Sequence, residues 1–264
     1  MKKLFTMALA ALLVVGCSSA PKTETTASPE ATKETTEATA STMVGIGSVT
    51  SMNLTDATAD KEGSAQANTT IATIVLDGDV IKSLKLDQAQ NTVKFDTKGV
   101  VTSDKEAATP TKAEKGADYG MKVASAIGKE WFEQAAAFEE YAVGKTVAEV
   151  LATPATGSED LKTSVTIDVA GFVSAVEVAS KNVKEVKGAV KVGTASITAI
   201  TDLADAGEKE GGAKFNTTYA VIVEDADGKI AYLVIDTAQN GFKFDTKGVI
   251  TSDKAAPTLT KKEK

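Results

Sequence analysis

Two stretches of the chain alternate apolar and polar positions with the two-residue period of a β-strand. Residues 69–89 (TTIATIVLDGDVIKSLKLDQA) place β-branched runs on both sides of Asp77-Gly78, which is a hairpin signal. Residues 217–238 (TTYAVIVEDADGKIAYLVIDTA) repeat this pattern around Asp227-Gly228. Residues 91–103 predict another strand, with a turn at Lys98-Gly99. The alternation favours antiparallel sheets that are covered on one side.

Between these stretches the apolar period changes to that of a helix. Residues 118–144 (DYGMKVASAIGKEWFEQAAAFEEYAVG) predict a helix with Asp118 as its N-cap. Its apolar stripe consists of Met121, Ala124, Ile127, Trp131 and Ala135. The residues TVAE at 146–149 form a capping-box pattern that opens a short helix. A last helix is expected in residues 167–186, where Phe172, Val176 and Ala179 share one face.

The strand regions belong to an internal repeat. KFDTKGVVTSDK at 94–105 returns as KFDTKGVITSDK at 243–254, and VGIGSVT at 44–50 aligns with VGTASIT at 192–198. The predicted fold is therefore α+β, with tandem modules that each contain a small antiparallel sheet. We expect a complete module at 43–188 and a second, truncated module at 189–264 that has only the strand half. A bare second sheet should be marginal, so it should pack against the first module, pair with another chain or be mobile.

The composition narrows the chemistry. The chain has no His and no Arg, and its one Cys is Cys17. The common general acid/base, the usual metal ligands and the bidentate phosphate clamp are therefore missing, and no metal site is expected. The formal net charge of −7 argues against a nucleic-acid partner. Any redox or transfer chemistry must come from a cofactor.

The N-terminus indicates export. MKKLFTMALAALLVVGC has two lysines, an apolar run too short for a comfortable membrane span, and then Cys17. LVVGC followed by SSA resembles a bacterial lipobox, which implies a signal peptide at 1–16 and a lipidated Cys17 that anchors the protein at the outer face of the cell membrane. The alternative is an ordinary secretory signal. Residues 18–42 contain almost no large apolar side chains and predict a disordered tether.

Residues 159–167 (EDLKTSVTI) raise a question about Thr166. Threonine is common where a helix begins, because its side chain can accept from a free backbone amide. Thr166 is thus either a helix cap or an acceptor hydroxyl for a covalent group. Thr50 in GSVT and Thr198 in ASIT end similar tetrads, but both lie in β-type sequence and are expected to serve strand pairing.

The segment Asp160–Thr166 resembles the D-x-x-[S/T]-G-A-T motif of FMN-binding domains that a flavin transferase modifies. Thr163 takes the Ser/Thr position and Thr166 the acceptor position, whereas Ser164 and Val165 replace Gly and Ala. This motif occurs together with the lipobox, KFDTKGVVTSDK at 94–105, DYGMKVASAIGKEWFEQ at 118–134 and GKTVAEV at 144–150. With this combination the chain closely resembles the flavinylated, pheromone-encoding lipoproteins of Gram-positive extracellular electron transfer.

The resemblance implies a phosphoester between FMN and Thr166, made by a flavin transferase. It implies a carrier that takes electrons from a membrane quinone or NADH dehydrogenase and passes them to extracellular electron acceptors, rather than an enzyme built on side-chain catalysis. We expect a helix N-terminus to favour the phosphoester charge. Tyr119, Met121 and Trp131 are candidates for the wall of the flavin site, although Met121 and Trp131 fit an ordinary core equally well.

Two other hypotheses remain open. A tether followed by repeated β-rich modules also fits a non-redox binding or adhesion lipoprotein, in which Thr166 is only a cap. The signal peptide could in addition release a short peptide pheromone. Because no counterpart of Asp160–Thr166 follows the second strand region, we expect one FMN per chain rather than two.

Overall fold

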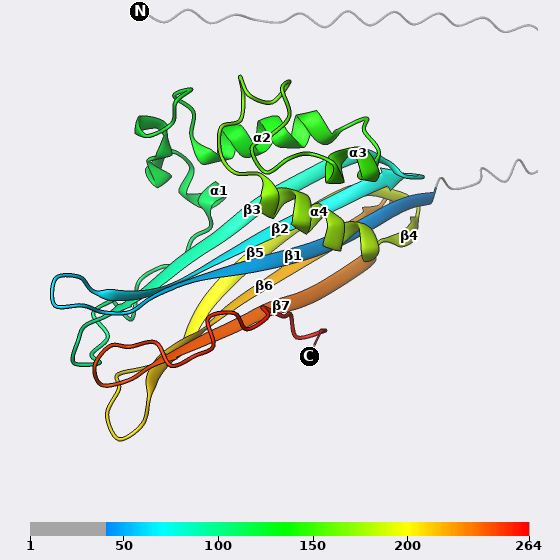
Figure 1. Ribbon diagram of the computed structural model, residues 1–264. Helices are drawn as coiled ribbons and strands as arrows, with labels where there is room; N and C mark the ends of the chain where they lie inside the picture. The colour runs from blue at the N-terminus through cyan, green and yellow to red at the C-terminus, as the bar shows by residue number, and fades with distance from the viewer. Residues whose placement is uncertain (1–40, 264) are drawn as a thin grey trace, which may run out of the picture. The chain divides into compact units, whose positions relative to one another are not determined.

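The computed structural model describes residues 41–263, which have a mixed α+β fold (Figure 1). The expectations for the signal peptide, Cys17 and residues 18–40 of the tether lie outside the described residues. The strands are β1 (Ser41–Thr55), β2 (Gly63–Asp77), β3 (Val80–Phe95), β4 (Lys184–Lys187), β5 (Ala189–Ala204), β6 (Gly211–Asp225) and β7 (Ile230–Phe244). The α-helices are α1 (Lys112–Lys115), α2 (Trp131–Ala142), α3 (Val147–Leu151) and α4 (Ala170–Lys181), with 3-10 helices η1 (Gly116–Tyr119) and η2 (Met121–Val123).

The strands form two antiparallel sheets. The first sheet is four-stranded in the order β3-β2-β1-β4, and the second is three-stranded in the order β5-β6-β7. The turns at Gly78 and Gly228 have φ angles of 62° and 74°, a conformation that glycine adopts without steric cost. The hairpins predicted around Asp77-Gly78 and Asp227-Gly228 are therefore confirmed.

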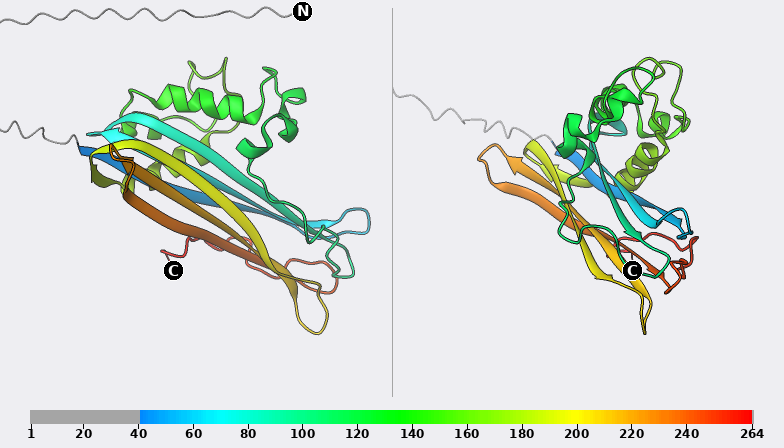
Figure 2. Two further views of the ribbon diagram at one scale, coloured as in Figure 1. Left: turned by 180° about the vertical axis from the view of Figure 1, so that it is seen from behind. Right: turned by 90° about the vertical axis from the view of Figure 1, so that its left-hand side faces the viewer.

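The two sheets pack against each other through one face each, and the helices cover the other face of the first sheet (Figure 2). Between the sheets, the Phe95 and Phe244 rings stack with centroids 4.1 Å apart. Further along the interface, the Thr194 hydroxyl donates to Thr73 Oγ1 at 2.8 Å. Of the three outcomes that the sequence allowed for the second sheet, the structure shows the first: it packs against the first module.

Reciprocal contacts join the loops at one end of the two sheets. The Asp56 carboxylate accepts from the Ile250 amide at 2.8 Å, and its repeat counterpart Asp205 accepts from the Val101 amide at 2.8 Å. In the same way, the Thr258 hydroxyl donates to the Thr50 carbonyl, and the Thr109 hydroxyl donates to the Thr198 carbonyl. The repeats therefore pack as a pseudo-symmetric pair within one chain.

The helical layer rests on a seam of small residues in β1. An added Cβ on Gly45 would lie 2.3 Å from the Ala179 carbonyl oxygen, and one on Gly47 would lie 2.4 Å from the Ala179 amide nitrogen. The buried face of α4 comprises Phe172, Ala175, Val176 and Ala179, which confirms the predicted stripe. Glycine in β1 thus lets the backbone of α4 approach the sheet closely.

Four local predictions were wrong. The last helix, expected in residues 167–186, spans only Ala170–Lys181, and Lys184–Lys187 forms β4 instead. The helix expected from Asp118 begins only at Trp131, because Gly120 and Gly128 adopt φ angles of 74° and 62° and interrupt the helical backbone. The strand expected at 91–103 is instead the second half of β3, which runs unbroken to Phe95 before the turn at Gly99. The first sheet is covered on both faces rather than one. The capping box at 146–149 is confirmed, since Thr146 accepts from the Glu149 amide.

Candidate functional site

The candidate acceptor Thr166 lies in an irregular segment that connects α3 to α4. Two of its neighbours, Leu161 and Val165, are buried in the core between the helices and the first sheet. The Val165 amide donates to the Leu161 carbonyl at 2.7 Å, which closes a turn of the backbone. These anchors leave the Thr166 side chain exposed at the surface.

Gln134 of α2 holds this segment. Its side chain is buried, and its Oε1 accepts from the Thr166 amide at 2.8 Å, from the Thr166 hydroxyl at 3.3 Å and from the Ile167 amide at 3.2 Å. Its Nε2 donates to Ser125 Oγ at 3.1 Å and to the Lys129 carbonyl at 3.3 Å. One buried amide therefore links the acceptor segment, α2 and the loop before α2, and every polar atom of that amide has a partner.

Thr166 is not a helix cap, which corrects one reading of this segment. Helix α4 begins at Ala170 with Val169 at the N-cap position, and the Asp168 carboxylate accepts from the Ala170 amide at 2.8 Å. The same observation overturns the expectation that a helix N-terminus directly flanks the Thr166 hydroxyl. The hydroxyl reaches Gln134 instead.

A cavity of about 610 Å³ adjoins Thr166, since the residues that follow it, Ile167 and Asp168, belong to the lining. Its volume lies in the range of about 300–1,000 Å³ that small-molecule sites occupy. The side chains of Met121, Trp131 and Phe172 line it from the helical layer. Trp131 contacts Phe172 edge-on, with ring centroids 5.8 Å apart. The cavity thus has an aromatic wall that is fixed by core packing.

Polar side chains of the first sheet line the cavity from below. They belong to Ser51 and Asn53 of β1, Gln66, Asn68 and Thr70 of β2, and Gln88 and Gln90 of β3. Thr50 of β1 also borders the cavity, but its hydroxyl pairs with Thr69 Oγ1 at 2.9 Å on the other face of the sheet. Hydrogen bonds across the strands fix several of them: Gln90 Nε2 donates to Asn68 Oδ1 at 2.9 Å, and Gln88 Nε2 donates to Thr70 Oγ1 at 2.7 Å. The same sheet face is apolar under α4 and rich in amides under the cavity.

Lys112 supplies the cavity with a cation. This side chain lines the cavity and is only 8 % exposed, and its Nζ lies 4.8 Å from the centroid of the Tyr119 ring and 5.5 Å from that of Trp131. Burial lowers the pKa of Lys112 to about 8, and the nearby Lys115 charge adds to this effect. Sequence reasoning missed Lys112, because nothing in its local pattern indicates burial.

Tyr119 lies beside this cavity but does not line it. Its hydroxyl donates to Gln90 Oε1 at 3.1 Å, and burial raises the pKa of that hydroxyl. Tyr119 therefore positions Gln90 and Lys112 rather than forming the wall itself. Met121 and Trp131 do line the cavity, and both also pack against the core, whereas their role as the wall of a flavin site stays a prediction.

The other motif residues lie near Thr166 in sequence but serve the local turn. Asp160 is exposed, and its carboxylate accepts from the Ser158 hydroxyl at 2.6 Å, a bond that lowers its pKa. The Ser164 hydroxyl donates to the Leu161 carbonyl at 3.2 Å, and Thr163 is exposed. Asp160, Thr163 and Ser164 do not line the cavity.

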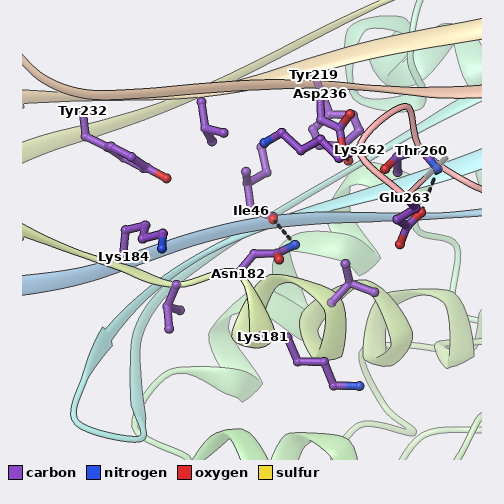
Figure 3. A pocket seen from close by; sticks show the side chains of 13 residues that line it. Ile46, Lys181, Asn182, Lys184, Tyr219, Tyr232, Asp236, Thr260, Lys262 and Glu263 are labelled. Atoms are coloured by element: carbon purple, nitrogen blue, oxygen red, sulfur yellow. Dashed lines mark hydrogen bonds between the residues drawn. The ribbon is translucent and has the colours of Figure 1, made fainter.

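A second cavity, of about 420 Å³, lies where α4 and β4 meet β6, β7 and the last described residues (Figure 3). In it the buried Tyr219 hydroxyl donates to Asp236 at 3.2 Å, and Asn182 Nδ2 donates to the Ile46 carbonyl at 3.3 Å. This cavity lacks the amide-rich floor of the first one.

Comparisons with known proteins add little to this site. No protein-family model and no solved structure matches the chain. A stretch of 40 residues, 15% of this chain, is 60% identical to a chlorophenol reductase of Desulfitobacterium hafniense and spans 12% of that protein. Such a match covers too little of either chain to define a family.

Residues 41–263 offer neither a candidate membrane-spanning helix nor a candidate metal centre. In this part of the chain, no helix has the length and apolarity to cross a membrane. The same residues contain no group of His, Cys, Asp or Glu side chains arranged to hold a metal ion.

Proposed function

We propose that the protein is a lipid-anchored extracellular carrier that holds FMN as a phosphoester on Thr166. In this proposal the repeats are tandem FMN-binding-type modules, of which the first carries the cofactor. Electrons arrive from a membrane quinone or NADH dehydrogenase and leave to extracellular acceptors, with Cys17 as the lipid attachment. FMN supplies the redox chemistry, which the side chains of this chain lack.

The observation that carries the proposal is the position of Thr166. Thr166 is exposed, so its hydroxyl is accessible to an external flavin transferase, and the residues that follow it, Ile167 and Asp168, line a cavity of about 610 Å³. Gln134 fixes the backbone on both sides of the acceptor position through the Thr166 and Ile167 amides. An attached group would therefore be held next to the cavity rather than at the end of a mobile loop.

The cavity lining fits the flavin ring system. Trp131, Met121 and Phe172 offer an apolar wall to a planar aromatic ring. Amide side chains such as Gln88 and Gln90 carry both donors and acceptors, which suits the carbonyl and N–H groups along the pyrimidine edge of that ring. Because Thr166 is exposed, water can solvate the phosphoester, and no arginine is required.

Intact-mass measurement of the native lipoprotein tests this proposal. We expect the mass of one FMN per chain and loss of that mass in Thr166→Ala, with Thr166→Ser retaining it in part because a hydroxyl remains. Thr156→Ala is a matched control, since Thr156 is exposed in the same connection. A colourless protein from cells that contain the transferase would contradict the proposal, and two flavins per chain would contradict the assignment of the site.

A non-redox binding lipoprotein is the second candidate, and one observation favours it. The outer face of the second sheet exposes Ile197, Leu233 and Ile235, which is unusual for a sheet without a partner. The mass measurement separates the two functions, because a binding protein carries no flavin. Release of a pheromone from the signal peptide stays a prediction, to be tested with synthetic peptides on responding cells.

A further inference from the structure

Lys112 is a buried cation without a carboxylate partner. Among residues 41–263, no Asp or Glu lies within ion-pair distance of its Nζ, which instead faces the Tyr119 and Trp131 rings. Taking an ammonium group out of water is costly, and cation–π contacts recover only part of that cost. A buried positive charge at the wall of a cavity is stabilised when a ligand with negative charge binds in that cavity.

The internal repeat shows that this burial is specific to the first module. Lys112 follows Thr111 in the segment TKAEK, and its counterpart Lys261 follows Thr260 in TKKEK. Lys261 is exposed, whereas Lys112 is buried. The local sequences are nearly the same, so the rings of η1 and α2 cause the difference. Of these two lysines, the buried one is the one that lines the cavity of about 610 Å³.

The charged groups around Lys112 do not neutralise it. In α1, Lys115 has the same sign, and the Glu114 carboxylate accepts from the Thr111 amide at 2.8 Å. On β3, Asp87 accepts from the Gln88 amide at 2.7 Å and the Ala113 amide at 3.3 Å. Asp168 lines the same cavity and caps the first turn of α4. Each nearby carboxylate is therefore engaged with backbone amides.

We propose that the charge of Lys112 raises the reduction potential of the flavin bound in this cavity, because it stabilises the anionic reduced form of the ring. This inference rests on the proposed function. Reduction takes the neutral oxidised ring, two electrons and one proton to a ring that carries one negative charge. The electrons come from the donor dehydrogenase and the proton from water. An enclosed ammonium group favours the charged product over the neutral starting ring.

The experiment compares the flavinylated, full-length lipoprotein with Lys112→Met and Lys112→Gln, and uses Lys261→Met as the matched control. The flavin content is measured by intact mass, and the reduction equilibrium by spectroelectrochemical titration with a chemical reductant at pH 7. We expect both Lys112 variants to keep the flavin and to have an equilibrium constant for reduction about tenfold lower, which for a two-electron couple is a potential about 30 mV lower. Lys261→Met should leave the equilibrium unchanged.

Each other outcome overturns the inference. Unchanged equilibria in both flavin-loaded Lys112 variants would show that the charge does not act on the ring. Unfolding of both variants, or loss of flavin from folded ones, would assign Lys112 to structure or to attachment instead. A parent protein without flavin would reject the proposed function itself, and the mass measurement distinguishes that result from the others.

Discussion

Strands β1–β3 and β5–β7 have closely related sequences and the same hairpin register, yet they differ on their outer faces. The outer face of β1–β3 lies under the helical layer, whereas the corresponding face of β5–β7 leaves Ile197, Leu233 and Ile235 exposed by 72%, 49% and 54%. Both faces retain the same cross-strand amide bond, Gln90 to Asn68 at 2.9 Å and Gln239 to Asn216 at 2.7 Å. The sheet is thus a common scaffold, and the candidate site is made by what the helices add to it.

The largest expected effect comes from breaking the contact that the two sheets share. Phe244 is fully buried and stacks on Phe95 at an interplanar angle of 7°, so Phe244→Ala removes the ring through which the second sheet packs on the first at this point. We expect a loss of about 3–5 kcal/mol in the free energy of unfolding. Denaturant titration measures it, with the exposed Val249→Ala as a control. A loss below about 1 kcal/mol would mean that the sheets do not depend on this contact.

The same Gly→Ala substitution can be made at Gly45, in the glycine seam of β1 under α4, and at its counterpart in the second sheet. Gly45→Ala places a methyl group 2.3 Å from the Ala179 carbonyl oxygen, so β1 and α4 must separate. We expect this to cost about 1–3 kcal/mol. The counterpart Gly193→Ala meets only a methyl group of Ile222 at 3.3 Å and should change stability by less than about 0.5 kcal/mol. Equal effects on thermal unfolding would show that α4 does not rest on this seam.

The Gln134 contacts exist only in the module with helices. Gln134→Leu leaves the Thr166 and Ile167 amides without their acceptor, and we expect a loss of about 1–3 kcal/mol in stability. Hydrogen exchange should accelerate at these two amides. Gln239→Leu, in the second sheet, is the control and should leave their exchange unchanged. Protection that survives in Gln134→Leu would contradict the assigned role.

The elements that the sequence predicted well depend on local chemistry. The β-branched runs around Asp77-Gly78 and the reciprocal cap between Thr146 and Glu149 are formed by residues close in sequence, and both are observed. The early start of the helix at Asp118 was wrong, because the backbone at Gly120 and Gly128 has positive φ angles that an apolar stripe does not reveal.

The candidate site was only partly accessible to such reasoning. Thr166 was singled out by its motif, but its partner Gln134 lies 32 residues away in the chain. Lys112 and Lys261 lie in the similar segments TKAEK and TKKEK but have opposite burial, so the local pattern gives little to distinguish them. Burial of Lys112 results from long-range packing of Tyr119 and Trp131, which a single sequence does not reveal.

The smallest expected effect concerns the turn that follows β3 and its counterpart after β7. Both turns should make the same contribution to the pH dependence of stability. The Asp96 carboxylate accepts from the Lys98 and Val100 amides, and Asp245 accepts from the Lys247 and Val249 amides. The amide bonds, with Val100 and Val249 as the largest contributors, hold the pKa of both carboxyl groups below the ordinary value of 3.8. The unfolded chain therefore takes up these protons first as the pH falls. The stabilising contribution is complete above pH 3.8 and is lost as the pH falls through the folded-state values.

Asp96→Asn and Asp245→Asn should each flatten the acid limb of the stability curve slightly and by the same amount, because both turns are exposed to water. Thermal unfolding between pH 2 and pH 6, about the span over which these carboxyl groups titrate, measures this effect. An Asp96 effect clearly larger than that of Asp245 would show that the helical layer reaches this end of the first sheet. Equal effects would confine the difference between the modules to the outer faces of their sheets.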